Sequence, residues 1–189
     1  MIITSDEEKL TNNKYLKTHE KRLAFLQKDL SRKGKGSNNR NKARLKVSKK
    51  HAKISDSRRD HLHKMTSRLV NENQVIAMES LEVSGMLKNK RLAKHISDSS
   101  WYELKRMLKY KCDWHRRELV EINQYYPSYK RCNNCGYTLS YLALKQRSWT
   151  CPKCNQKHDR GINAAKNIKE AGLALLACGD GVRPKLQVQ

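Results

Sequence analysis

The chain has 189 residues, and 41 Lys and Arg against 18 Asp and Glu give it a formal net charge of +23. An excess of this size predicts a polyanionic partner, above all nucleic acid. A membrane partner is not expected, because the sequence contains no long apolar span and no lipidation signal. The acidic start MIITSDEEKL lacks the apolar region of a secretory signal, so we expect a cytoplasmic protein.

The first part of the sequence predicts a small hairpin followed by two basic helices. Residues 1–11 contain two short β-type runs around an acidic turn. Residues 15–30 carry leucines at roughly helical spacing, which predicts a helix. A basic loop rich in glycine and asparagine follows, and a second, long helix is expected over residues 41–73.

Cations cover most of the expected long helix and recur in a second basic stretch at residues 84–97. Such a surface is ordinarily a solvated face, but the size of the charge excess favours contact with nucleic acid. The candidate contacts are Arg40, Lys42, Arg44, Lys46, Lys49, Lys50, Arg58, Arg59, Lys88, Lys90, Arg91 and Lys94.

A buried strand and an amphipathic helix are expected on either side of the second basic stretch. The apolar run at residues 75–78 fits a buried strand. Residues 84–97 predict a loop, and Ser97 or Ser99 is a candidate cap for a helix over residues 101–117. A further strand is expected near the 120th residue, and a last helix close to the C-terminal tail.

Two cysteine pairs predict a metal module between that strand and the last helix. Cys132 and Cys135 form one CxxC turn, Cys151 and Cys154 form the other, and fifteen residues separate the pairs. Each turn directs two thiolates at one ion, and four thiolates make the closed tetrahedral site of structural zinc. Because no coordination position stays open, we do not expect this ion to carry out chemistry. Paired CxxC motifs favour metal binding in a reducing compartment over disulfides.

Several motifs together resemble one protein family. The segments VIAMESL, SGMLKNKRLAKHISDSSW, YYPSYKRCNNCG, the second CxxC and HDRGINAAKNI resemble the TnpB (OrfB) proteins of bacterial insertion sequences, which are relatives of the type V CRISPR effectors. The resemblance implies a RuvC-like nuclease of the RNase H fold with an inserted zinc ribbon. It also implies a bacterial, nucleoid-associated protein whose partners are DNA and RNA, since full-length members are RNA-guided DNA nucleases encoded with transposons.

The resemblance further implies three acidic residues that hold two magnesium ions, because two-metal chemistry needs a carboxylate cluster. Glu79 matches the second acid, at the end of the VIAME strand. The first acid belongs to a Gly-Ile-Asp-Leu-Gly strand that has no counterpart in this sequence. Gly161 stands at the position of the third acid, and Asp159, two residues earlier, is the alternative ligand. Magnesium is therefore not expected to bind productively here.

The expected fold is an α/β chain with an incomplete RuvC-like core that lacks its first strand. It also has long basic helices and an inserted four-cysteine zinc ribbon. We expect four parts: a partial core with a basic helical insertion over residues 1–127, the ribbon over 128–157, a final helix segment over 158–178 and a flexible tail over 179–189.

The expected function is that of a truncated, nuclease-deficient TnpB-type transposase or accessory protein that binds nucleic acid. Losing one member of a cooperating catalytic set commonly removes most of the rate. One alternative is half of a split RNA-guided endonuclease, whose missing strand comes from a partner chain. The other alternative is a basic zinc-ribbon binding module, which would have no need of Glu79.

Overall fold

A computed structural model describes residues 2–11, 14–91, 93–143 and 145–178, so the predicted flexible tail lies outside the described residues. The chain is a mixture of α-helices and short β-strands, which confirms the α/β class.

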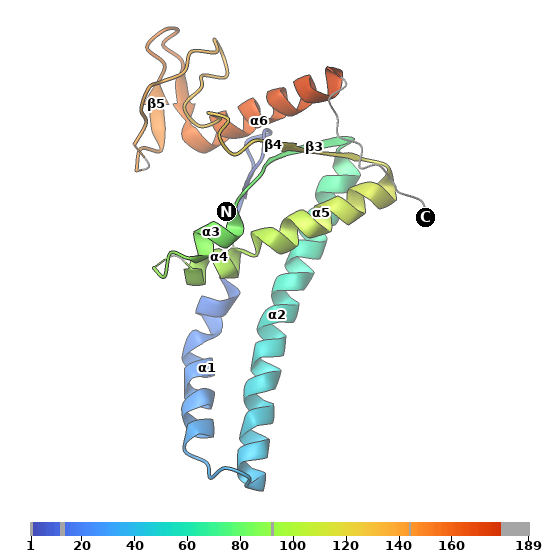
Figure 1. The fold of residues 1–189 in the computed structure, drawn as a ribbon, viewed down its shortest axis with the longest axis vertical. Coiled ribbons are helices and arrows are strands. Elements are labelled where there is room, and N and C mark those ends of the chain that lie inside the picture. Colours follow the sequence, from blue (N-terminus) through green and yellow to red (C-terminus); the bar gives the residue numbers. More distant parts are fainter. Residues whose placement is uncertain (1, 12–13, 92, 144, 179–189) are drawn as a thin grey trace. The chain divides into compact units, whose positions relative to one another are not determined.

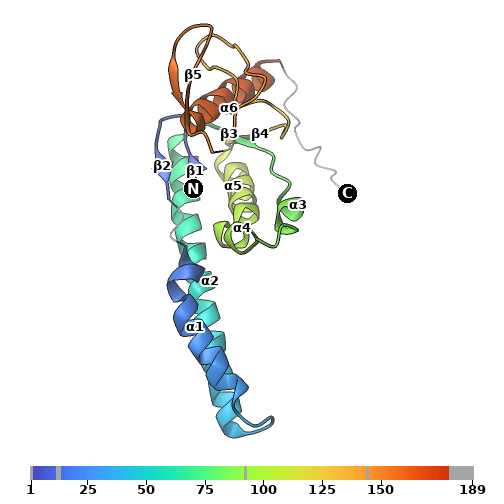
Figure 2. The ribbon, with the colours of Figure 1, turned by 90° about the vertical axis from the view of Figure 1, so that its left-hand side faces the viewer.

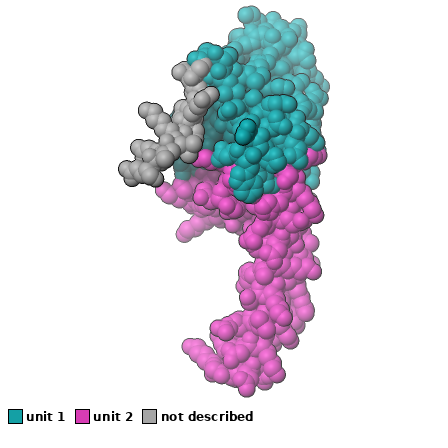
Figure 3. All heavy atoms as spheres, turned by 90° about the vertical axis from the view of Figure 1, so that its right-hand side faces the viewer, with its two compact units in different colours: residues 1–11, 70–82, 111–189 teal, residues 12–69, 83–110 magenta. Residues whose placement is uncertain are grey.

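Two compact units make up the chain (Figure 3). Unit 1 consists of Met1–Thr11, Val70–Glu82 and Lys111–Gln189, and unit 2 consists of Asn12–Leu69 and Val83–Tyr110. These units follow the packing of the chain and not its motifs, so the four-part division expected from the sequence stays a prediction.

Unit 1 is built around a parallel pair of strands, β3 (Val75–Glu79) and β4 (Glu118–Ile122). Their register runs from Val75 opposite Glu118 to Glu79 opposite Ile122. Both strands were expected from their apolar runs. The helix α6 (Arg160–Ala177) packs against both strands (Figure 1), in keeping with the rule that the faces of a parallel pair are covered.

A glycine permits the close contact between α6 and this strand pair. Gly172 is buried, and a Cβ atom placed on it would lie 2.5 Å from the Cβ of Ala77 and 3.8 Å from the Cβ of Val120. The helix therefore approaches the strands more closely than any larger residue would allow. This contact fixes the position of α6, whose first turn carries the HDRGINAAKNI motif.

A hairpin at the start of the chain also packs on α6. Strands β1 (Ile2–Ile3) and β2 (Lys9–Leu10) are antiparallel, as expected, and residues 5–7 form the turn. Lys9 Nζ lies 2.7 Å from Asp159 Oδ2, and Lys166 Nζ lies 2.9 Å from Glu7 Oε1. Two ion pairs thus connect the hairpin to the first turns of α6.

Unit 2 contains two helices that lie side by side, α1 (Tyr15–Ser31) and most of α2 (Asn38–Glu72) (Figures 1 and 2). Both helices were expected, but α2 begins three residues earlier than predicted. Ser37 explains the earlier start, because its hydroxyl accepts a hydrogen bond from the Arg40 N–H at 3.1 Å and caps the helix. Apolar side chains from both helices are buried in this unit: Leu23, Leu26, Ala43, Ile54 and Leu62.

The predicted loop at residues 84–97 is wrong at both ends, which are helical, and right in the middle, where residues 88–91 form a turn. This stretch contains α3 (Val83–Leu87) and most of α4 (Ala93–Ser99), and α5 (Trp101–His115) follows. The cations Lys88, Lys90 and Arg91 lie in that turn, and buried Ile96 packs α4 within unit 2. Ser97 and Ser99 therefore lie inside a helix and do not cap the next one.

No helix in the described part of the chain is long and apolar enough to cross a membrane.

Candidate functional site

The metal module consists of two similar turns and a short antiparallel strand pair, β5 (Ser148–Thr150) with β6 (Lys157–Asp159). In the first turn, the Gly136 N–H donates to the Cys132 carbonyl at 2.9 Å. In the second turn, the Asn155 N–H donates to the Cys151 carbonyl, also at 2.9 Å. Gly136 and Asn155 have φ angles of 74° and 56°. Glycine and asparagine tolerate this left-handed conformation best, so the sequence favours both turns.

These turns bring the four predicted ligands together. The sulfur atoms of Cys132, Cys135, Cys151 and Cys154 all lie within 4.8 Å of one another, and the pairs Cys132–Cys154 and Cys135–Cys151 are 3.6 Å apart. Tetrahedral zinc with Zn–S bonds of about 2.3 Å requires sulfur–sulfur distances of about 3.8 Å. Among the described residues this is the one cluster of Cys, His, Asp or Glu that could hold an ion. The donor set and its geometry fit zinc.

The four thiols have unequal surroundings. Burial raises the pKa of Cys132 to about 12. Hydrogen bonds from the Asn134 side chain and the Gln156 backbone N–H lower the pKa of Cys154 to about 6. A metal ion must displace the proton of Cys132, so affinity for the ion falls as the pH falls.

Two buried asparagines of α6 hold the first cysteine turn. The Asn163 side-chain amide donates to the Arg131 carbonyl at 2.7 Å, and the Asn167 amide donates to the Ser128 carbonyl at 2.7 Å. In return, the Asn163 side-chain carbonyl accepts the Asn133 N–H at 3.1 Å. Neither asparagine was predicted from the sequence. The available signal was the pair of asparagines at i and i+4 on the buried face of an otherwise apolar helix.

Asp159, the alternative acid, has a structural role at the start of α6. Its Oδ1 accepts the N–H groups of Gly161 and Ile162 at 2.8 and 3.1 Å, which makes Asp159 the N-cap of the helix. Its Oδ2 accepts a hydrogen bond from Lys9. The Lys9 hydrogen bond is the largest cause of a lowered pKa for this carboxyl. Both oxygens are therefore already engaged.

Gly161, at the position of the third acid, faces the N-terminal hairpin. A Cβ atom there would lie 2.3 Å from the Cδ1 atom of Ile3. Since that atom is the end of a flexible side chain, a larger residue at position 161 requires Ile3 to turn away. The present pair of residues is thus matched in volume, with the isoleucine filling the space beside the glycine.

Glu79 lies at the C-terminal end of β3, as predicted, and is half-buried. Burial raises the pKa of its carboxyl. Within the described residues Glu79 belongs to no cluster of three or more possible metal ligands. The structure thus confirms the place of Glu79 at the end of this strand, and its role as a catalytic acid stays a prediction.

We expect Glu79→Gln to stabilise the fold at neutral pH. A carboxyl whose pKa is raised in the folded state carries a desolvation penalty once it ionises. This penalty is absent below the pKa that the Glu79 carboxyl has in the unfolded chain, because Glu79 is then protonated in both states. The variant should therefore raise the free energy of urea unfolding at pH 7.5, and the gain should disappear near pH 4. Glu118→Gln on the neighbouring strand, at an exposed position, is the matched control. A loss of stability at pH 7.5 would contradict the prediction.

The predicted nucleic-acid contacts fall into two groups. Eight of the twelve cations are exposed, and their side chains form no ion pair with the residues that the structure describes: Lys42, Arg44, Lys46, Lys49, Arg59, Lys88, Lys90 and Arg91. The other four have contacts within unit 2. Arg40 donates to the carbonyls of Leu30 and Lys33, both at 3.1 Å, and so caps the C-terminal end of α1.

The remaining three cations contact side chains. Lys50 Nζ lies 3.1 Å from His19 Nδ1, and Lys94 forms an ion pair with Glu20. Arg58 pairs with buried Asp98 at 3.0 Å.

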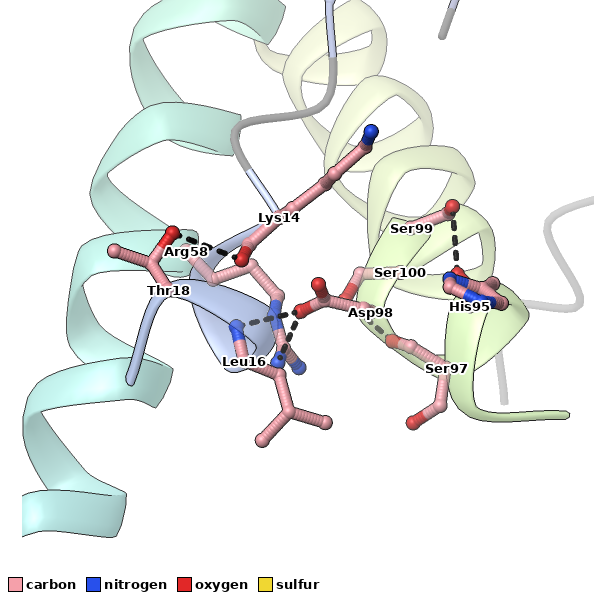
Figure 4. A network of polar contacts seen from close by, with 9 residues as sticks. All are labelled: Lys14, Leu16, Thr18, Arg58, His95, Ser97, Asp98, Ser99 and Ser100. Carbon is pink, nitrogen blue, oxygen red and sulfur yellow. Dashed lines mark hydrogen bonds and ion pairs between the residues drawn. The ribbon is translucent and has the colours of Figure 1, made fainter. Parts of the chain in front are cut away.

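Asp98 joins three helices of unit 2 (Figure 4). Its Oδ1 accepts the Leu16 N–H at 3.3 Å, at the first turn of α1, and Arg58 of α2 donates to the same oxygen. Asp98 itself belongs to α4. A residue distant in sequence therefore caps α1, whose own N-cap residue, Lys14, makes no side-chain cap. The serines on either side of Asp98 were the predicted caps, and the aspartate was not expected to have this role.

Comparison with known proteins extends the resemblance seen in the motifs. The OrfB_IS605 family, described as "Probable transposase", matches residues 1–90. The family described as "Cas12f1-like, TNB domain" matches residues 101–168, which include the four cysteines. A candidate RNA-guided DNA endonuclease of Streptomyces pristinaespiralis is 52% identical over 185 residues, which are 98% of this chain and 46% of that protein. TnpB-like protein L79 of Acanthamoeba polyphaga mimivirus is 29% identical over 131 residues, which are 66% of this chain and 25% of that protein. The chain belongs to the TnpB (OrfB) family.

Two further comparisons show how much of the length of related proteins this chain covers. The candidate RNA-guided DNA endonuclease InsQ of Escherichia coli (strain K12) is 36% identical over 180 residues, which are 87% of this chain and 44% of that protein. The chain thus spans less than half the length of the curated relatives it matches. A solved structure of Cas12f1 with sgRNA and target DNA has the same fold, with a TM-score of 0.57 and 18% identity. The match covers 84% of this chain and 42% of the Cas12f1 chain.

Proposed function

We propose that this TnpB-family chain binds DNA and RNA through the exposed cations of unit 2 and through its metal module. The observation that carries the proposal is the row of exposed cations on α2, which has no acidic partners within the described residues at Lys42, Arg44, Lys46 or Lys49. Cations without a partner in the protein are available to phosphate groups, and each contact releases a counterion.

Exposed tyrosines support a second part of the interface, on the metal module and in the segment just before it. Tyr125 and Tyr141 are 83% and 78% exposed, and Tyr129 and Tyr137 are about half as exposed. Exposed cations accompany them at Lys145, Arg147, Lys153 and Lys157. Aromatic rings among cations form stacking platforms for unpaired bases. We assign the metal, as zinc, the task of holding this surface in shape, since four thiolates leave no position open for a substrate.

We propose that the chain by itself does not cleave nucleic acid. The resemblance assigns metal binding to three carboxylates. Among the residues matched to these carboxylates, only Glu79 offers a carboxylate that is not already engaged. Gly161 has no side chain, and both Asp159 oxygens accept hydrogen bonds. A single carboxylate is insufficient for two magnesium ions. Magnesium-dependent cleavage of DNA by the purified chain, abolished by Glu79→Ala, would overturn this part of the proposal.

An incomplete RuvC-like core is the finer proposal for the fold of unit 1. Within the described residues β3 pairs with β4 alone, so its other edge has no strand partner. Unpaired strand edges accept further strands. We propose that an additional strand, from another segment or a partner chain, completes the sheet next to β3. This is the arrangement that a split endonuclease would use, and it is the second candidate function.

The salt dependence of binding tests the proposed interface. In a variant with Lys42, Arg44, Lys46 and Lys49 all changed to Gln, the fall of log K with log salt should be less steep. The steepness should decrease by about 0.9 for each duplex phosphate that the variant no longer neutralises. Fluorescence anisotropy with labelled duplex DNA between about 50 and 200 mM salt measures the slope.

The matched control changes the three lysines of this set to Arg, which keeps every charge. It should retain the wild-type slope. An equal slope in the Gln variant and in wild type would rule out these four residues of α2 as the contact surface.

A further inference from the structure

A buried histidine lies against the predicted metal ligands without belonging to them. His158 is only 6% exposed, and its Nε2 atom lies 3.1 Å from the sulfur of Cys132. The four cysteines form a complete ligand set, and His158 does not belong to this cluster. Four cysteines already supply every ligand position of a tetrahedral ion. Because the ring nitrogen lies at hydrogen-bonding distance from one of the sulfurs, it is placed to contact that ligand and not the ion.

The position of the imidazole is fixed from its other side. His158 lies opposite Trp149 in the register of β5 and β6, and both side chains are buried. The two ring centroids are 4.7 Å apart, with an angle of 40° between the ring planes. Cross-strand aromatic contact of this kind restricts the rotation of both side chains. The Nε2 atom is therefore held at Cys132 by the strand pair itself.

The chemistry at Cys132 calls for a donor. When bound to a dication, four thiolates leave a net charge of about −2 on the centre. Cys132 is fully buried, so water does not solvate its share of that charge. Its sulfur receives hydrogen bonds from the backbone N–H groups of Cys135 and Asn134. An imidazole N–H adds a third donor, and it is a side-chain donor that mutation can remove.

We propose that His158 is a positioning residue of the metal centre, whose Nε2–H donates a hydrogen bond to the Cys132 thiolate and thereby retains the ion. The proposal rests on the proposed occupancy of the four-cysteine site by zinc. Partners of metal ligands in this outer position typically change metal affinity by about 10- to 100-fold when they are replaced. His158 has no other part in the proposed chemistry.

Two substitutions separate the donor from the shape of the ring. His158→Phe keeps an aromatic ring against Trp149 and removes the N–H, so zinc affinity should fall by about 10- to 100-fold. His158→Gln places an amide N–H near the position of Nε2, so affinity should stay close to wild type. Competition with a chromophoric chelator measures affinity, after zinc analysis of the wild-type chain has established one ion per chain. With cobalt in place of zinc, the sulfur-to-metal charge-transfer band should shift in the Phe variant and much less in the Gln variant.

The outcomes distinguish this inference from the metal centre on which it rests. A wild-type chain that binds no zinc overturns both. One zinc per chain, with the Phe variant binding as tightly as wild type, overturns the role of His158 alone. A measurement on the wild type avoids any dependence on how the variants fold. Long-range ¹H–¹⁵N spectra of the zinc-loaded chain should show the proton of the His158 ring on Nε2, and a neutral ring protonated on Nδ1 would overturn the proposal.

Discussion

Removal of zinc is expected to unfold the metal module and to release the start of α6. Structural zinc of this type contributes on the order of 10 kcal/mol to folding. The module has few other sources of stability, because its apolar cluster consists mainly of the cysteines themselves with Leu142, Trp149 and the partly buried Leu139. Purified protein should contain about one zinc per chain, and a strong chelator should abolish the near-ultraviolet circular dichroism of Trp149, which is buried beside the ligands.

The effect should spread to α6 along specific hydrogen bonds. Asn163 and Asn167 both donate to backbone carbonyls of the segment that leads into the first cysteine turn, at Ser128 and Arg131. If that turn unfolds, two buried amides are left without their acceptors, at a cost of about 1–3 kcal/mol each. Hydrogen exchange should therefore report weaker protection in the first turns of α6. The helices of unit 2 should keep their protection, since none of the zinc ligands belongs to that unit.

Cysteine variants provide the control. Cys151→Ser removes a fully buried ligand and should lose the zinc, whereas Cys178→Ser changes an exposed cysteine that lies outside the cluster and should retain it. Zinc content by atomic emission and near-ultraviolet circular dichroism are the measurements. Persistence of the native spectrum after complete removal of the metal would contradict the predicted dependence of the module on zinc.

The sequence predicted those features that depend on local chemistry. The CxxC spacing predicted which four cysteines the structure brings together, because a knuckle is a short turn with fixed residue types. The strand at residues 75–79 and the helix α6 followed from apolar patterns. The structure confirms these elements, and the family comparison agrees with the motifs.

Contacts between distant residues were not predictable in the same way. Asp98 caps a helix that begins 83 positions earlier in the chain, at Tyr15, and nothing near either residue marks the pairing. The basic stretch before it was interpreted as a loop because its charge suggested solvation. The cations Lys88, Lys90 and Arg91 do lie in a turn, but the ends of the stretch are helical, and Ile96 is buried in the second of them. Tertiary packing decided both cases.

Asp98→Ala is expected to destabilise unit 2 by about 3 kcal/mol. The side chain of Asp98 is 7% exposed, and its removal leaves the Arg58 guanidinium without its carboxylate and the Leu16 N–H without its acceptor. Breaking a buried ion pair from one side costs about 3–5 kcal/mol, and the lower value applies because the Arg58 side chain is still 24% exposed. Urea unfolding followed by far-ultraviolet circular dichroism measures the change.

Asp60→Ala is the matched control in the same unit. Asp60 also accepts from a cation, Lys64, at 2.7 Å, but these side chains are 60% and 77% exposed. An exposed pair at i and i+4 contributes about 0.5 kcal/mol or less. Equal decreases in stability in the two variants would show that Asp98 has no special role in joining the helices.

A double-mutant cycle decides what Arg58 does. If the Asp98 pair is its main interaction, Arg58→Met combined with Asp98→Leu should destabilise unit 2 by much less than the sum of the single changes, since an apolar pair replaces two opposite charges without leaving either one buried alone. Arg58→Met should also leave the salt slope of DNA binding unchanged, unlike the decrease expected at Lys42 and its exposed neighbours. A less steep salt dependence in Arg58→Met would instead assign Arg58 to the nucleic-acid surface, as the sequence first suggested.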